Sequence, residues 1–187
     1  MKSLFVFITV CMVTFFTVNS FAQDAVAKKH AFIGMTSCKM CHNSDKIGGK
    51  QFGTWDTSKH AKAYQTLLTD KANEIATKKG LKVPAAKAPE CLKCHASGYD
   101  TDTTFIGKKF KVEDGVQCET CHGAGADYKD TKIMKVKEDA KKNGLIIPDD
   151  KEKFCVKCHN AESPSFISFN YEEYWAKIKH GKKVEVK

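Results

Sequence analysis

Four copies of the pattern Cys-x-x-Cys-His constrain this chain more than any other feature of its sequence. Two cysteines spaced in this way on one helical turn can each form a thioether bond to a haem vinyl group. The histidine that follows then lies beneath the iron as its proximal ligand. A single copy would also fit a zinc half-site or a redox dithiol, but a zinc protein has no need for a histidine after every cysteine pair. The sequence therefore predicts four covalently attached c-type haems. The predicted attachment residues are Cys38, Cys41 and His42; Cys91, Cys94 and His95; Cys118, Cys121 and His122; and Cys155, Cys158 and His159.

Four haems in a chain of 187 residues leave little room for a core made of protein alone. We therefore expect a mainly α-helical fold with much irregular loop, in which short helices wrap around four closely packed haems. A composition of 42% hydrophobic and 28% charged residues excludes a disordered chain, a collagen-like repeat and a membrane protein with several spans. The motifs recur at unequal intervals, so a regular solenoid is not expected.

The first residues have the features of an export signal. Lys2 is followed by an apolar stretch over residues 4–18, with small residues after it at the cleavage offsets. This stretch is shorter than the roughly 20 residues that a membrane-spanning helix needs, although an uncleaved N-terminal anchor is the alternative. A lipoprotein is not favoured, because Cys11 lies too early and follows a bulky residue. We expect cleavage after Ala22 and export to the periplasm, or alternatively to the cell surface. The predicted regions are a signal peptide over 1–22 and a tetrahaem cytochrome c domain over 23–187.

The charge balance bears on the partners of the chain. All 31 basic residues are lysines, against 22 acidic residues, and the formal net charge is +9. Two interpretations stay open: the lysines neutralise the haem propionates, or they form a face that docks acidic redox partner proteins, membrane-associated ones included. Nucleic-acid binding is not expected of an exported haem protein that contains no arginine.

Three histidines remain after the four proximal ones, so at most three irons can have two histidine ligands from this chain. His60 is the first candidate for a distal ligand. Residues 58–78 predict a helix that Gly80 ends, and His60 lies on its apolar face. A histidine on such a face is either a satisfied core residue or a buried ligand. With four haems filling the interior, we favour the ligand.

His30 and His180 are the other two candidate distal ligands. His30 lies eight residues before the first motif, close enough to reach the first haem or a neighbour. The alternative is an exposed residue at a frayed N-terminus. His180 follows a short helix with an apolar stripe, and its alternative role is a surface histidine favoured by the helix C-terminus. One iron is left without a second histidine. Its candidate sixth ligands are Met35 and Met134, but we prefer an iron with no sixth ligand.

Three further segments have local predictions. Residues 103–116 alternate apolar and polar side chains around Gly107, which predicts a short β-hairpin. Residues 135–142 predict a helix that Gly144 ends. The apolar residues 145–148 predict a buried connector to the fourth motif.

Several stretches of the chain match one family of haem proteins. They are Trp55, Ser58 and His60–Ala63 after the first motif; Cys91, Cys94, His95 and Gly98; Gly115, Val116, Cys118, Glu119, Cys121–Gly123 and Gly125; and, in general character, the segment 169–180. In these stretches the chain resembles the tetrahaem c-type cytochromes of the cytochrome c-554 family. The resemblance covers most of the predicted mature chain, and it implies a mainly helical shell, haems in stacked pairs and a role in electron transfer.

The resemblance also implies a set of iron ligands. His60 would ligate the fourth haem opposite His159, and His180 would ligate the third haem opposite His122. The second haem, at His95, would be five-coordinate and high-spin. The family takes the distal histidine of the first haem from the loop after the third motif, where this chain has none before the fourth motif. His30 is our substitute for it.

Two functional hypotheses from different classes follow, and a third stands beside them. As an electron carrier, the chain would pass electrons between partner proteins through closely spaced haems. As an enzyme, it would reduce a small ligand such as nitric oxide, nitrite or peroxide at an open iron. The absence of arginine and the shortage of histidine leave no evident group for acid catalysis, which favours the carrier. The third hypothesis is a subunit of a larger conduit or filament, which would self-associate and take the missing ligand from a neighbouring chain.

Overall fold

The computed structural model describes residues 29–46 and 49–181. The predicted signal peptide and its cleavage site lie outside these residues. The described parts contain helices, turns and loops, and their β structure is limited to two isolated bridges, Phe32 with Ile106 and Ser44 with Gly49. The prediction of a mainly α-helical fold with much irregular loop is therefore confirmed. None of the described helices is long and apolar enough to cross a membrane.

The helices are short, and most are followed by a turn or an extended segment. In chain order they are α1 (Met35–His42), α2 (Gln51–Asp56), α3 (Ala63–Leu67), α4 (Asp70–Lys78), η1 (Ala85–Lys87), α5 (Pro89–His95), η2 (Thr103–Phe105), η3 (Val112–Asp114), α6 (Cys118–His122), α7 (Thr131–Met134), α8 (Lys137–Lys142), α9 (Lys151–Cys155) and α10 (Tyr171–Ile178).

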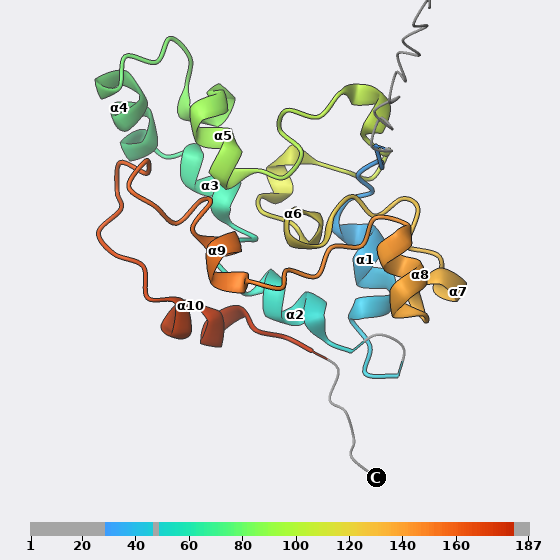
Figure 1. The fold of residues 1–187 in the computed structure, drawn as a ribbon. Helices are drawn as coiled ribbons and strands as arrows, with labels where there is room; N and C mark the ends of the chain where they lie inside the picture. The colour runs from blue at the N-terminus through green and yellow to red at the C-terminus, as the bar shows by residue number, and fades with distance from the viewer. Residues whose placement is uncertain (1–28, 47–48, 182–187) are drawn as a thin grey trace, which may run out of the picture.

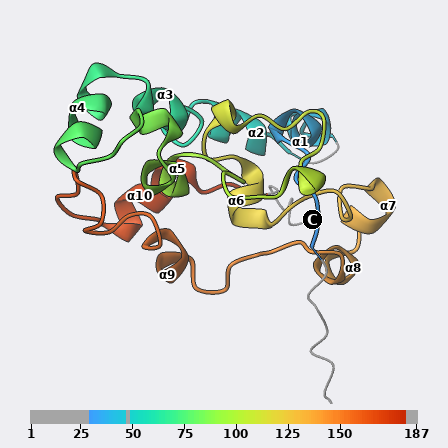
Figure 2. The same ribbon diagram turned by 90° about the horizontal axis from the view of Figure 1, so that it is seen from above.

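The helices form two ends with α6 between them (Figures 1 and 2). One end contains α1 with α7 and α8. The other contains α3, α4, α5 and α9. Helix α6 packs against α1, and α3 packs against α5. Because α1, α5 and α6 each contain one of the four motifs, this arrangement distributes the motifs along the molecule.

The single helix predicted over residues 58–78 is wrong, because this segment forms turns followed by two helices, α3 and α4. The break lies at Thr69, whose side-chain oxygen accepts the backbone N–H of Ala72 and so caps the start of α4. A threonine that bonds to the backbone in this way favours a new helix start over a helix interior. His60 consequently lies in a turn before α3, not on a helical face. Gly80 follows α4 with a φ of 74°, as its predicted role at the helix end requires.

The hairpin predicted over residues 103–116 is also wrong. The segment forms the two short helical turns η2 and η3, and it pairs with the N-terminal segment instead of with itself. Phe32 donates its N–H to the carbonyl of Phe105 at 2.8 Å, and the N–H of Gly107 donates back to the carbonyl of Phe32 at 2.7 Å. Alternating polarity is compatible with pairing within the segment or with a distant strand, so the local pattern could not distinguish a hairpin from pairing with Phe32.

The segment that leads to the fourth motif differs in part from its prediction. Helix α8 ends before Gly144, which has a φ of 101°, but it begins at Lys137 and is separate from α7. The connector predicted to be buried is largely exposed, with Ile146 48% and Ile147 38% accessible. The backbone of this segment is nevertheless anchored, because Ile146 donates its N–H to the carbonyl of His122 at 2.9 Å.

The apolar core of the described residues is small. The buried hydrophobic residues are Ile33, Phe52, Leu67, Ala76, Ala85, Ala88, Ala96, Phe110, Tyr128 and Ala140, of which half are alanines. The largest side chains that are fully buried are polar, namely Gln117 and Glu119. Burial of apolar area is the main stabilising term in folding. So small a core is consistent with the expectation that cofactors fill the interior.

Candidate haem-attachment site

The motif residues of the chain lie on tight helical turns. Helices α1, α5 and α6 each contain both cysteines and the histidine of one motif. The fourth motif starts at the last residue of α9 and continues as turns, in which His159 donates its N–H to the carbonyl of Cys155 at 3.0 Å. None of the eight cysteines of these motifs forms a disulfide bond. The first, second and third motifs therefore have the compact helical geometry that two thioethers and one iron ligand require, and the fourth has a turn of the same kind.

Cysteines from different motifs lie against one another. A hydrogen bond with Cys118 is the main cause that raises the pKa of Cys38. Burial is the main cause that raises the pKa of Cys158 to about 12, and the charge of Cys94 and a hydrogen bond with it act in the same direction. Burial and then Cys155 raise the pKa of Cys121 to about 11. The first motif therefore adjoins the third, the third adjoins the fourth, and the fourth adjoins the second.

The rings of His122 and His180 are in edge-to-face contact, with His180 just after the C-terminal end of α10. Their centroids are 6.0 Å apart with an angle of 66° between the ring planes. Two imidazoles on opposite sides of one metal ion have centroids about 6 Å apart, since each nitrogen lies about 2 Å from the metal. The spacing fits one iron between these rings. Helix α10, which Asn170 caps by accepting the N–H of Glu173, directs the chain toward His180.

His60 and His159 form a second pair with the same spacing. Their ring centroids are 6.0 Å apart at an angle of 62°. The carbonyl of His60 accepts the N–H of Val116 at 3.0 Å, which fixes this turn against the segment before α6. Burial is the main cause that lowers the pKa of His60, and it also lowers that of His159. Both rings are thus favoured in the neutral form that binds a metal.

Three of the proximal histidines have an oriented ring. The Nδ1 atoms of His95 and His122 lie 2.8 Å from the Ala63 carbonyl and 3.0 Å from the Ile146 carbonyl, respectively. A carbonyl oxygen can only accept, so these Nδ1 atoms are the donors and the proton is on Nδ1. The Nε2 lone pair of each ring is then available for a metal. The Nδ1 atom of His42 makes the corresponding contact, at 3.3 Å, with Oε1 of Gln51 at the start of α2.

His30 is also ordered, but its surroundings differ. Its side chain is 20% exposed, and its Nδ1 lies 2.7 Å from Oδ2 of Asp127 in the loop after α6. The frayed N-terminal position considered above is therefore not what the structure has. No ring contact joins His30 to His42 within the described parts of the chain. The structure thus brings two of the three candidate distal histidines onto a proximal partner, and places the third beside a carboxylate.

The candidate methionine ligands have no such arrangement. Met35 begins α1 and lines a cavity of about 430 Å³. The other lining residues are Trp55, Asp56, Ala61, Lys62, Gln65 and Asp114. Met134 ends α7 and is half-buried. Neither sulfur makes a hydrogen bond to a motif histidine in the described residues.

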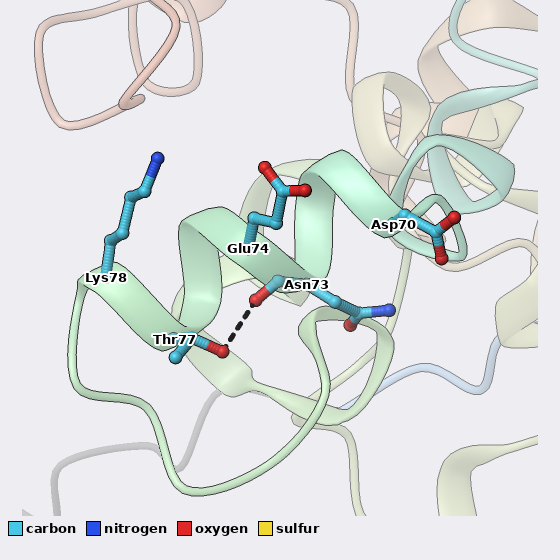
Figure 3. Close-up of a pocket in the computed structure, with 5 residues that line it drawn as sticks. All are labelled: Asp70, Asn73, Glu74, Thr77 and Lys78. Carbon is cyan, nitrogen blue, oxygen red and sulfur yellow. Dashed lines mark hydrogen bonds between the residues drawn. The ribbon is translucent and has the colours of Figure 1, made fainter.

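A larger cavity, of about 640 Å³, lies beside α4 and is lined by that helix alone. Figure 3 shows its residues as polar side chains along the helix, with the Thr77 hydroxyl donating to the Asn73 carbonyl at 2.9 Å. No motif residue lines it, so size alone does not identify the functional site here. Its lining residues are Asp70, Asn73, Glu74, Thr77 and Lys78.

Glu119 is a site residue whose role the sequence analysis missed. It lies inside the third motif, is 2% exposed and accepts three backbone N–H groups. The donors are Ile33 at 2.9 Å, Gly34 at 2.8 Å and Gly125 at 2.7 Å. Burial raises the pKa of Glu119, while these hydrogen bonds act in the opposite direction. The carboxylate ties the entry to α1 to the loop after α6. The only hint in the sequence is an acidic residue in a motif whose other copies have none.

Comparison with known proteins agrees with this chemistry. Residues 37–123 match the family described as cytochrome c554 and c-prime, and this segment contains the first three motifs. A solved structure of cytochrome c554 from Nitrosomonas europaea, in its reduced state, aligns with a TM-score of 0.49 and 22% identity, covering 82% of this chain and 80% of that one. None of the curated proteins matches. The family match supports covalently bound haem c and a role in electron transfer. Over residues 37–123 the chain is therefore similar to the cytochrome c554 and c-prime family, as its motifs predicted.

Proposed function

We propose that this chain is an exported tetrahaem c-type cytochrome that transfers electrons between redox partner proteins. The observation that carries the proposal is the pair of facing histidine rings, His60 with His159 and His122 with His180, each at 6.0 Å. Nothing in a small protein core requires two such pairs at one spacing. Two irons that each take a proximal and a distal histidine would account for both.

The residues of the chain would divide the work as follows. The eight motif cysteines hold the haems covalently, and His42, His95, His122 and His159 serve as proximal ligands. His60 and His180 serve as distal ligands of the fourth and third haems, and His30 is the candidate distal ligand of the first, which leaves the second haem five-coordinate. Haem iron, when bound, supplies one-electron redox chemistry. The protein orients four of these rings through hydrogen bonds at Nδ1, namely those of His42, His95, His122 and His180.

The contacts between motifs support an order for the attachment sites. Cys38 adjoins Cys118, Cys121 adjoins Cys155, and Cys158 adjoins Cys94. The sites then follow the sequence first, third, fourth and second through the molecule. Figure 1 is in keeping with this order, since α6 lies between α1 at one end and α5 at the other. An electron carrier with this order would have the first and second haems at its two ends.

The second haem supports the alternative function, a reductase of small ligands. His95 has an oriented Nδ1, yet no ring contact joins it to another histidine in the described residues. An iron held there would have an open sixth position for nitric oxide, nitrite or peroxide. The carrier remains the better supported function, because the chain contains no arginine and its other histidines are engaged elsewhere. The conduit or filament subunit would differ from both by self-association.

Export and partner docking complete the proposal. Residues 1–22 would direct the chain to the periplasm and be removed, which leaves the domain over 23–187. The formal charge of +9 favours acidic partner proteins, through steering of the encounter. Because four haems also bring propionates, part of this charge would be neutralised within the protein.

The test is to produce the chain with its haems attached and to record its mass, its haem content and the EPR spectrum of the ferric form. We expect four haems per chain, low-spin signals from the histidine pairs and one high-spin signal that changes when nitric oxide is added. Fewer than four haems would overturn the tetrahaem assignment. Four low-spin haems that ignore nitric oxide would exclude the open iron, and with it the reductase. Steady turnover of nitric oxide or nitrite would favour the enzyme over the carrier.

A further inference from the structure

We propose that His30 and Asp127 act as one unit, in which Asp127 orients His30 as the distal ligand of the first haem and lowers the reduction potential of that haem. This inference rests on the proposed function. It concerns a carboxylate to which the sequence analysis gave no role. Asp127 is a positioning residue here, since it would act through the imidazole of His30 and not touch the iron.

The segment that contains His30 is held on both sides. Its Phe32 exchanges two hydrogen bonds with the loop at 105–107, and the carbonyl of Ala31 accepts the N–H of Ala126 at 3.1 Å. Glu119 accepts the N–H groups of Ile33 and Gly34, which follow Phe32. His30 is therefore fixed beside the loop after α6 by backbone contacts that do not involve its own ring.

The ring of His30 is oriented for metal binding. Its Nδ1 lies 2.7 Å from the Asp127 carboxylate, with the two side chains 20% and 33% exposed. Since a carboxylate accepts, the Nδ1 carries the proton, and Nε2 is left as the ligating atom. The ring packs on Gly144, where an added Cβ would come within 2.7 Å of it. A side chain at Gly144 would push the ring away, and the φ of 101° excludes one for a second reason.

The location assigns His30 to the first haem. His60 and His180 already face the fourth and third proximal histidines, which leaves His42 and His95 without a distal partner. Asp127 follows α6, which packs against α1, and His95 belongs to α5 at the far end (Figure 2). The thiols of the first and third motifs adjoin as well. No ring contact joins His30 to His42 in the described residues, so the assignment rests on this neighbourhood, in which the first haem is the one that lacks a distal histidine.

The carboxylate distinguishes this ligand chemically from the other candidates. The Nδ1 atoms of His95, His122 and His180 meet neutral carbonyl oxygens, and that of His42 meets an amide oxygen. A carboxylate makes the imidazole a more basic ligand than a neutral acceptor does. A more basic ligand stabilises ferric iron over ferrous iron. The first haem should therefore have a lower reduction potential than a haem whose histidine ligands donate only to neutral oxygens.

The experiment compares Asp127→Asn and His30→Ala with the unmodified holoprotein by EPR and by spectroscopic redox titration. Asp56→Asn is the matched control, because it removes one negative charge from an exposed position on α2, which packs against α1. Asp127→Asn should raise the potential of one low-spin haem and leave the others unchanged. A tenfold change in its ferric-to-ferrous ratio corresponds to about 59 mV. We take tenfold as the order of the effect, because mutation of second-shell partners typically changes metal affinity or activity by about 10–100-fold. His30→Ala should convert that same haem to high-spin.

Several results would overturn the inference. They are an Asp127→Asn titration that matches the Asp56→Asn control, and a His30→Ala spectrum that keeps every low-spin signal. If Asp127→Asn fails to accumulate, Asp127→Glu keeps the carboxylate and should restore both the low-spin spectrum and the low potential; failure to do so also counts against the unit. Haem content is measured in each variant. Four haems together with a negative result would refute the His30–Asp127 unit while leaving the proposed function intact.

Discussion

Replacing Glu119 by glutamine should destabilise the protein by about 2 kcal/mol. The carboxylate accepts the N–H groups of Ile33 and Gly125 at Oε1 and that of Gly34 at Oε2. Glutamine keeps one accepting oxygen and places an NH₂ group where the other was. Because the side chain is 2% exposed, water cannot replace the lost acceptor. One buried N–H at the start of α1 then has no acceptor.

The magnitude follows from the kind of bond that is lost. A hydrogen bond to a charged group contributes roughly 1.5–3 kcal/mol, and an unsatisfied buried donor costs about 1–3 kcal/mol. Part of this loss is offset, because the substitution also removes a buried charge whose desolvation raises the pKa of Glu119. Glu119→Ala removes all three bonds and should cost about twice as much as Glu119→Gln.

The assay is urea unfolding of the haem-loaded variants, followed by far-UV circular dichroism. Glu74→Gln is the control, because it makes the same chemical change at an exposed position. Figure 3 shows Glu74 on α4. We expect Glu74→Gln to stay within about 0.5 kcal/mol of the unmodified protein. A Glu119→Gln variant that is as stable as this control would refute the claim that the carboxylate ties α1 to the loop after α6.

Three further predictions concern the histidine pairs and one partly buried hydrogen bond. His180→Ala should keep all haems attached but turn one low-spin EPR signal high-spin, and an unchanged spectrum would exclude His180 as a ligand. Burial lowers the pKa of His60 and His159. A histidine whose pKa is lower in the folded protein than in the unfolded chain contributes its full stabilisation at pH values above its unfolded pKa. This stabilisation is lost as the pH falls through its folded pKa. The low-spin signal of this pair should persist in acid titrations below about pH 6.5, the value of a free histidine, because the lowered pKa and the binding of Nε2 to iron both oppose protonation. Loss of the signal at or above that pH would contradict the assignment. Trp55→Phe removes the 2.7 Å bond from the indole N–H to the Val116 carbonyl and should lower the free energy of unfolding by about 1 kcal/mol, with a urea midpoint equal to that of the parent as the opposing result.

The sequence predicted the chemistry of the chain better than its local structure. The family resemblance and the mainly helical fold are confirmed, because the motif spacing and the composition express local requirements. The helix over 58–78 failed because periodicity does not register a capping bond such as the one made by Thr69. The hairpin over 103–116 failed because the pairing partner of that segment is Phe32, far along the chain.

Without the family resemblance, the site could be predicted only as a set of residue types. The histidines were identified as candidate ligands by counting, and the resemblance implied two pairings whose rings the structure brings to 6.0 Å. His30 was a candidate without a defined environment, and its contact with Asp127 joins segments that no local pattern relates. Glu119 was visible in the sequence, but its burial and its three donors were not.

What the sequence by itself determined is the capacity to attach haem, because thioether formation and proximal ligation depend on residues within a single turn. Only the tertiary structure decided which histidine meets which, and which motif adjoins which. Those pairings depend on the sum of many weak contacts between distant segments, such as the hydrogen bonds that hold Ile33, Gly34 and Gly125 on one buried carboxylate. Each contact is small, and none leaves a signal in the residues on either side of it, so they act only when the whole chain has packed.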